Sequence, residues 1–224
     1  MRARILSKEY ASLAVSGKPF RWLRLAKLRY EDDYGVEREW ESVERIPRGS
    51  SKAERTVDGV AILARLHSGI DGKSGQPLNP RIVLVSQFRP PTGRRTLELP
   101  AGLLDSPDED PVGAALRELK EETGYSARAA DAQVDADLAA VSDPGLSNTN
   151  LVVVRVDVDD ALHGNGAPSP QPDEGESIEV HLLPLGPGLL PAVRELCRSR
   201  GFLVHAQLYQ LALGLAMAAP TARL

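Results

Sequence analysis

Charged side chains are concentrated in one short segment, Arg117-Glu118-Leu119-Lys120-Glu121-Glu122. If this segment is a helix, Glu118 and Glu122 lie one turn apart and Glu121 lies beside them, so the three carboxylates can converge on one spot. Like charges at this spacing repel one another unless a cation lies among them. Hard divalent ions, Mg²⁺ above all, take oxygen ligands of this kind and also hold substrate phosphates. The spacing therefore predicts a metal site on one face of a helix.

The alternative is a solvated charged face, which is what most acidic runs are. The flanking residues favour a helix that packs onto the fold. Asp110 can cap its start, Pro111 suits its first turn, and Gly124 suits its end. We therefore expect a docked helix that presents its acids to a site and buries an apolar side made of Ala114, Ala115, Leu116 and Leu119.

The same stretch, from Gly102 through Glu109 to the run Arg117 to Tyr125, resembles the Nudix box. This box is the signature of hydrolases that cleave a nucleoside diphosphate linked to another group. Six residues separate Gly102 from Glu109, one more than in the box, while Glu109 keeps the usual spacing to Arg117. Asp108 is the other candidate for the first acidic position. We expect a bulge in this loop and undisturbed metal ligands.

The resemblance assigns the metal ligands. It implies that Glu118, Glu121 and Glu122 hold Mg²⁺, or Mn²⁺ in its place, with the backbone carbonyl of Ala101 completing the shell. Arg117 then organises the glutamates through hydrogen bonds.

The resemblance also implies a separate carboxylate that acts as the catalytic base. Residues 160–177 are rich in Gly, Pro, Ser and acids and are expected to form a mobile loop, and such loops can close over an active site. Glu176 falls where this family carries a loop glutamate proposed as the base. Glu174 and Glu179 are the alternatives.

Residues Trp22 to Val43 predict two strands joined by a turn, because apolar and charged residues alternate on both sides of the EDDYG sequence. Both tryptophans of the chain, Trp22 and Trp40, lie in this hairpin. A strand tryptophan is most often a core or interface residue. Paired indoles can also hold a base between them, since every base offers a π-face.

The order WLRLAKLRY, EWESVER, TVDGVAI and IVLVSQFRPP is similar to the ADP-sugar pyrophosphatase branch of the Nudix superfamily. In that branch an N-terminal β extension mediates a homodimer. The resemblance implies that Trp22 and Trp40 stack on the adenine, one from each subunit. It also places Glu41 at the base edge and Arg45 near the diphosphate.

Three further positions are assigned to the substrate. Arg89 ends an apolar strand and precedes two prolines, and its guanidinium suits phosphate oxygens, although a surface cation is the alternative. Asp143, in the sequence DPGLSN, would border the terminal ribose or would only initiate a turn. Gly102, the first residue of the box, lies in the expected turn after Glu98 and is placed in the substrate site.

Composition sets outer limits on the function. The chain has 224 residues, which suits one domain or a domain with a small extension, and a net charge of −4 does not favour nucleic-acid polymers as partners. The lone Cys197 excludes an internal disulfide. No apolar run approaches the roughly 20 residues of a membrane span, so we expect a soluble protein of the cytoplasm, or of the nucleus in a eukaryote.

The expected fold is an α/β Nudix fold, with an α/β/α sandwich around a mixed sheet. Residues 1–55 are expected to form a small N-terminal β subdomain for dimerisation, and residues 56–224 the catalytic domain. The implied reaction converts ADP-ribose to AMP and ribose 5-phosphate. Alternatives are another ADP-sugar, an oxidised guanine nucleoside diphosphate, or a catalytically silent nucleotide sensor. A purely structural dimer module is the weakest alternative, because it leaves the carboxylate cluster and Arg89 unexplained.

Overall fold

The computed structural model describes residues 2–11, 14–15, 18–46, 57–74, 78–106, 109–161, 165–172, 175 and 177–218. The chain divides into two compact units. The small unit comprises residues 1–58, 105–108 and 138–151, and the large unit comprises residues 59–104, 109–137 and 152–224. The boundary predicted after residue 55 lies outside the described residues and stays a prediction.

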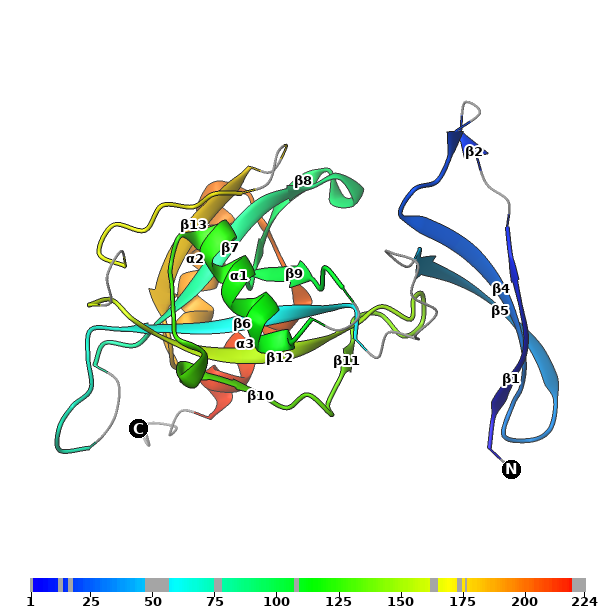
Figure 1. Cartoon of the computed structure of the whole chain (residues 1–224), viewed down its shortest axis with the longest axis horizontal. Helices are drawn as coiled ribbons and strands as arrows, with labels where there is room; N and C mark the ends of the chain where they lie inside the picture. The colour runs from blue at the N-terminus through cyan, green and yellow to red at the C-terminus, as the bar shows by residue number, and fades with distance from the viewer. Residues whose placement is uncertain are drawn as a thin grey trace. The chain divides into compact units, whose positions relative to one another are not determined.

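The small unit is built on a three-stranded antiparallel sheet of order β1-β4-β5 (Figure 1). Its strands are β1 (Arg4–Tyr10), β4 (Leu23–Glu31) and β5 (Glu37–Arg45), and a short pair, β2 (Ala14–Val15) and β3 (Lys18–Pro19), lies between the first two in sequence. The predicted hairpin is therefore confirmed.

The turn between β4 and β5 is held by Asp32. Its carboxylate accepts hydrogen bonds from the backbone N–H groups of Tyr34, at 2.9 Å, and Val36, at 3.0 Å. Gly35 has a φ of 78°, which glycine adopts without the steric cost of a β-carbon. The EDDYG sequence thus supplies both the side chain and the glycine that this turn needs.

The large unit contains one sheet whose main path is β10-β12-β6-β7-β8-β14. In addition, β9 pairs with β6 and β13 with β7, and β11, which belongs to residues 138–151 of the small unit, pairs with the start of β12. β14 runs parallel to β8, whereas β7 pairs antiparallel with β8 and β13, so the predicted mixed sheet is confirmed. The strands are β6 (Gly59–His67), β7 (Arg81–Arg89), β8 (Arg94–Glu98), β9 (Ala101–Leu103), β10 (Ala132–Val134), β11 (Ala140–Val141), β12 (Asn150–Asp159), β13 (Ile178–Pro184) and β14 (Leu203–Val204).

Helices cover both faces of this sheet. Figure 1 shows α1 (Pro111–Thr123) in front of the strands, with α2 (Leu189–Arg200) and α3 (Ala206–Met217) behind them. Two 3₁₀ turns, η1 (Pro90–Thr92) and η2 (Ala129–Asp131), complete the described helical elements. The predicted α/β/α sandwich is confirmed. No helix among the described residues is long and apolar enough to cross a membrane.

The alternation of side chains along β7 builds two core layers. Ile82 and Leu84 are fully buried and belong to the cluster that includes Leu189 of α2 and Leu208 of α3. Residues between them in the strand point to the opposite face, which α1 covers. Cys197 packs against the α2 and α3 cluster, and burial raises the pKa of its thiol.

Candidate active site

The helix that carries the acidic run begins and ends where the sequence predicts. The Asp110 carboxylate accepts a hydrogen bond from the Gly113 N–H at 3.0 Å, and Pro111 occupies the first turn. Gly124 has a φ of 76° and its N–H donates to the carbonyl of Lys120. These caps satisfy backbone groups that a helix end otherwise leaves unpaired.

One side of α1 is buried against the sheet, through Ala114, Ala115 and Leu119. Glu122 lies on this buried side, with only 5% of its surface exposed. Its Oε2 accepts a hydrogen bond from the backbone N–H of Ala101 at 3.1 Å. The last turn of the helix is therefore joined directly to β9.

Arg117 is the centre of the acidic cluster. Its Nη1 donates to Glu118 at 2.8 Å and to Glu121 at 3.4 Å, and its Nη2 donates to Glu109 at 3.2 Å. The same Nη2 lies 3.2 Å from the carbonyl oxygen of Leu103. One guanidinium group thus orients three carboxylates and ties them to β9. Of the two candidates for the first acidic position, Glu109 meets Arg117, and Asp108 lies outside the described residues.

A side chain on the middle residue of β9 would displace the carboxylate of Glu118 on α1. A β-carbon built on Gly102 would lie 1.9 Å from Cδ of Glu118. On its other side, a β-carbon on Gly59 of β6 would lie 2.4 Å from the carbonyl oxygen of Gly102. Gly59 therefore allows the backbones of β6 and β9 to pair, and Gly102 leaves room for the Glu118 side chain. Gly59 was not predicted, because its role depends on the pairing of two strands far apart in sequence.

The chemistry of these side chains fits a hard divalent ion, because carboxylate and carbonyl oxygens are the ligands that Mg²⁺ takes. In the arrangement described, Arg117 lies between Glu118 and Glu121, and Glu122 is turned toward Ala101. Within the described ranges, no three acidic, histidine or cysteine side chains are drawn together as a metal-binding group. The assignment of Glu118, Glu121, Glu122 and Ala101 as ligands stays a prediction.

Arg89 is oriented by a buried partner. Its Nε and Nη2 donate to the two carboxylate oxygens of Glu98 at 2.8 Å and 2.7 Å, and Glu98 is 6% exposed. Such a paired geometry fixes the plane of the guanidinium group. Arg89 lies at the end of β7, directly before η1, and its role at the phosphates stays a prediction.

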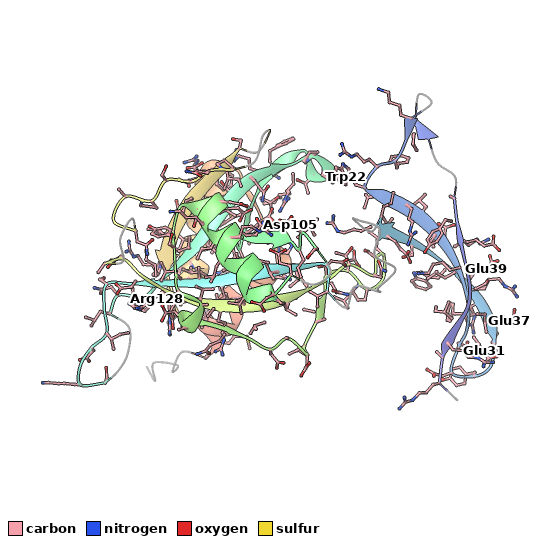
Figure 2. All side chains as sticks on the ribbon, in the orientation of Figure 1. Trp22, Glu31, Glu37, Glu39, Asp105 and Arg128 are labelled. Atoms are coloured by element: carbon pink, nitrogen blue, oxygen red, sulfur yellow. The ribbon has the colours of Figure 1, made fainter. Side chains whose placement is uncertain are left out.

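The two tryptophans lie at different positions along the small sheet. Trp40 pairs with Leu28, six residues beyond Trp22 on the neighbouring strand, and this offset corresponds to about 20 Å. Figure 2 shows Trp22 at one end of the sheet, well away from Glu39, the neighbour of Trp40. Both indoles are about half exposed, at 50% and 49%. Within one subunit they are too far apart to hold one base between them.

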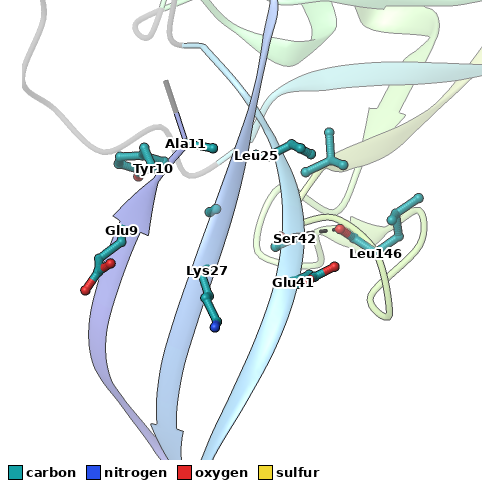
Figure 3. Close-up of a pocket in the computed structure, with 10 residues that line it drawn as sticks. Glu9, Tyr10, Ala11, Leu25, Lys27, Glu41, Ser42 and Leu146 are labelled. Carbon is teal, nitrogen blue, oxygen red and sulfur yellow. Dashed lines mark hydrogen bonds between the residues drawn. The ribbon is translucent and has the colours of Figure 1, made fainter. Parts of the chain in front are cut away.

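Glu41 and Trp40 are consecutive residues of β5, so their side chains point to opposite faces of the sheet. Glu41 lines a cavity of about 450 Å³ together with Leu25, Lys27 and Val43 (Figure 3). That Trp40 and Glu41 point to opposite faces could have been predicted from the sequence, because they are consecutive residues of an expected strand. The contact of Glu41 with the edge of the base stays a prediction.

A turn from the distant segment 138–151 packs against β5. The Val43 N–H donates to the carbonyl of Leu146 at 2.9 Å, and the Ser42 hydroxyl donates to the same oxygen at 3.3 Å (Figure 3). The indole N–H of Trp40 donates to the carbonyl of Gly145 at 3.0 Å. None of these three bonds was predicted, because they join residues about 100 positions apart.

The remaining predicted residues are not brought together by the described contacts. Arg45 is the exposed last residue of β5. Asp143 begins the turn that packs on β5, which confirms a turn at this sequence, and its place beside a ribose stays a prediction. Glu176 and Glu174 lie outside the described residues, whereas Glu179 lies in β13 and is bonded to Arg200 at 2.7 Å.

Known proteins resemble this chain over most of its length. An uncharacterized Nudix hydrolase of Schizosaccharomyces pombe is 38% identical over 195 residues, covering 87% of this chain and 86% of that protein. The ADP-sugar pyrophosphatase of Mus musculus is 37% identical, covering 87% and 82%. The ADP-ribose pyrophosphatase of Saccharomyces cerevisiae is 42% identical, covering 73% and 67%.

The fold is also that of a solved structure. An ADP compounds hydrolase matches with a TM-score of 0.53 at 20% identity, over 90% of this chain and 97% of that chain. Residues 71–189, which contain the whole of α1 and its acidic cluster, match the NUDIX domain family. The chain therefore belongs to the Nudix hydrolase family.

Proposed function

We propose that this protein hydrolyses the pyrophosphate bond of ADP-ribose and related ADP-sugars to AMP and a sugar 5-phosphate. The observation that carries the proposal is the cluster in which Arg117 holds Glu109, Glu118 and Glu121 against β9. The yeast and mouse relatives, named for ADP-ribose and ADP-sugars, support this substrate class over other nucleoside diphosphates.

Most of the oxygen ligands would come from α1. Glu118, Glu121, Glu122 and the carbonyl of Ala101 would hold Mg²⁺, which when bound neutralises phosphate charge and makes the bridging phosphorus more electrophilic. The hydrogen bonds from Arg117 limit the rotation of the Glu118 and Glu121 side chains, so these carboxylates occupy few conformations before a metal binds.

Arginines steady the negative charge that develops on the phosphates. Arg89 suits this role because Glu98 holds its guanidinium plane in place, and Arg45 would assist from the end of β5. Glu176 would take the proton from the attacking water. The water oxygen then forms a bond to one phosphorus, the bond from that phosphorus to the bridging oxygen breaks, and the bridging oxygen leaves with the other phosphate. The Glu176 carboxyl afterwards releases its proton to solvent.

The small unit would bind the base and join two subunits. Its sheet exposes apolar side chains on both faces, with Leu25 45% exposed on one face and Trp40 49% exposed on the other. A three-stranded sheet of this kind gains stability by packing against another element. The offset of about 20 Å between the indoles supports a homodimer in which Trp22 of one subunit meets Trp40 of the other.

The test is product analysis by chromatography after incubation with Mg²⁺ and a substrate panel. The panel contains ADP-ribose, ADP-glucose, NADH, diadenosine polyphosphates and oxidised GDP. The proposal predicts that ADP-ribose is consumed fastest and yields AMP with ribose 5-phosphate. Fastest cleavage of oxidised GDP would contradict the substrate class, and tight binding of ADP-ribose without turnover would contradict the enzymatic activity.

A further inference from the structure

The turn at residues 143–147, which we call the docked turn, is a compact unit. The N–H groups of Leu146 and Ser147 both donate to the carbonyl of Asp143, at 3.1 Å and 2.8 Å. The turn lies along the edge of β5 that faces away from β4, because the Val43 N–H that binds Leu146 points to that edge. A bridge between Val43 and Ser147 continues the contact.

The Trp40 indole reaches over the same edge and binds the middle of the docked turn. Its Nε1–H donates to the carbonyl of Gly145 at 3.0 Å. Gly145 is also next to the side chain of Asp143, since a β-carbon on residue 145 would lie 3.7 Å from Oδ1 of Asp143. A single hydrogen bond thus links the Trp40 indole to Gly145, which lies next to the Asp143 carboxylate.

An indole can serve two partners at once, because its N–H lies in the ring plane and its π-face is perpendicular to it. A base stacked on the face leaves the bond to Gly145 intact. The bond in turn restricts rotation of the ring, so the face is held ready for the base. Ordering the ring at one partner reduces the cost of ordering it at the other.

We propose that Trp40 is a positioning residue for Asp143, in addition to any stacking role. Its indole N–H fixes the docked turn, and through Gly145 it sets the carboxylate that faces the sugar end of the substrate. This inference rests on the proposed function for the identity of the substrate, but the attachment of the turn is a property of the ligand-free protein. Substitutions at Trp40 therefore act at both ends of the substrate.

The attachment is tested by amide hydrogen exchange without substrate. Trp40→Phe keeps an aromatic face but lacks the N–H, and it should raise exchange at Val43 and Leu146 roughly three- to tenfold, the effect of losing one hydrogen bond. Trp40→Leu should raise it by a similar factor, and Trp22→Phe is the matched control that should leave it unchanged. Exchange in β6 and β7 should be unaffected by all three.

Two results would overturn the attachment. Unchanged exchange at Val43 and Leu146 in Trp40→Phe would show that the N–H does not hold the turn. A rise in Trp40→Leu with none in Trp40→Phe would show that side-chain packing holds it instead.

The link to Asp143 is tested by a double-mutant cycle on kcat/KM for ADP-ribose. Trp40→Phe should lower kcat/KM roughly three- to tenfold in the wild-type background and by a clearly smaller factor in an Asp143→Ala background, where only its effect on base stacking remains. Additive losses would overturn the link. If the wild-type protein cleaves no ADP-sugar, the proposed function fails, while the exchange experiment still decides whether Trp40 holds the turn.

Discussion

A β-carbon on residue 102 would lie 2.0 Å from Oε1 of Glu118, so the lack of a side chain at Gly102 decides where this carboxylate lies. We predict that Gly102→Ala moves Glu118 away from Arg117, to which it is bonded at 2.8 Å, and lowers kcat for ADP-ribose about 10- to 100-fold. Steady-state kinetics at saturating Mg²⁺ measures the loss.

The control for this substitution is Gly113→Ala on the same helix. A β-carbon there would have Oδ2 of Asp110 as its nearest neighbour, at 3.8 Å, which is ordinary contact. This variant should keep full activity and gain up to about 1 kcal/mol of stability, because alanine is the better helix former. Wild-type activity in Gly102→Ala would show that the position of Glu118 does not matter.

A second prediction concerns the charge at the centre of the cluster. Arg117→Lys keeps the charge but cannot reach Glu109, Glu118 and Glu121 at once, because an ammonium group is a single point donor. The Mg²⁺ concentration for half-maximal rate should rise about 10- to 100-fold. The matched control is Arg198→Lys, which changes an exposed pair with Glu195. This variant should need the same Mg²⁺ concentration for half-maximal rate as the wild type. A wild-type Mg²⁺ titration for Arg117→Lys would mean that the guanidinium fork has no organising role.

The offset between the tryptophans predicts complementation between inactive subunits. If each base site takes Trp22 from one subunit and Trp40 from the other, Trp22→Leu and Trp40→Leu are each inactive alone. Mixing them after subunit exchange should restore about a quarter of wild-type activity, since about half of the dimers are mixed and each has one intact site. Either variant mixed with itself is the control. No recovery in a mixture that contains heterodimers would place both indoles in one subunit or neither in the site.

A further prediction concerns acid stability of the small unit. Glu44 is 3% exposed and accepts hydrogen bonds from Lys8 at 2.5 Å, Tyr10 at 3.1 Å and Arg24 at 3.2 Å. Burial alone would raise the pKa of this carboxyl, but the hydrogen bonds from Lys8 and Tyr10 and the charges of Lys8 and Arg24 outweigh it, so the net pKa is lowered. Glu44 therefore stabilises the fold at pH values above its unfolded pKa, and this stability is lost as the pH falls through its folded pKa.

Fluorescence can follow this loss, because both tryptophans belong to the small unit. Glu44→Gln should reduce the stability of this unit at pH 7 by about 2 kcal/mol and flatten its dependence on pH below about 4.5. Glu39→Gln, which breaks an exposed pair with Lys27, should leave the acid transition unchanged. An identical acid transition in wild type and Glu44→Gln would remove Glu44 as its cause.

Helix caps and turn residues in the sequence predicted the elements whose limits depend on neighbouring residues. The limits of α1 follow from Asp110 and Gly124, and the β4 to β5 hairpin follows from the turn around Asp32, because caps and turns use neighbours in sequence. The hydrogen bond between Trp40 and Gly145 could not be predicted from the sequence. It depends on how a distant turn meets the edge of β5, which no local pattern encodes.

The most direct test of the account is the Mg²⁺-dependent cleavage of ADP-ribose by Glu122→Gln. This substitution keeps the size of the side chain and an oxygen that can accept from the Ala101 N–H, but it removes the negative charge. The matched control is Glu195→Gln on the exposed side of α2. We predict a loss of about 100-fold or more in kcat for Glu122→Gln and none for the control. An unchanged Mg²⁺-dependent rate in Glu122→Gln would contradict the assignment of α1 as the metal site.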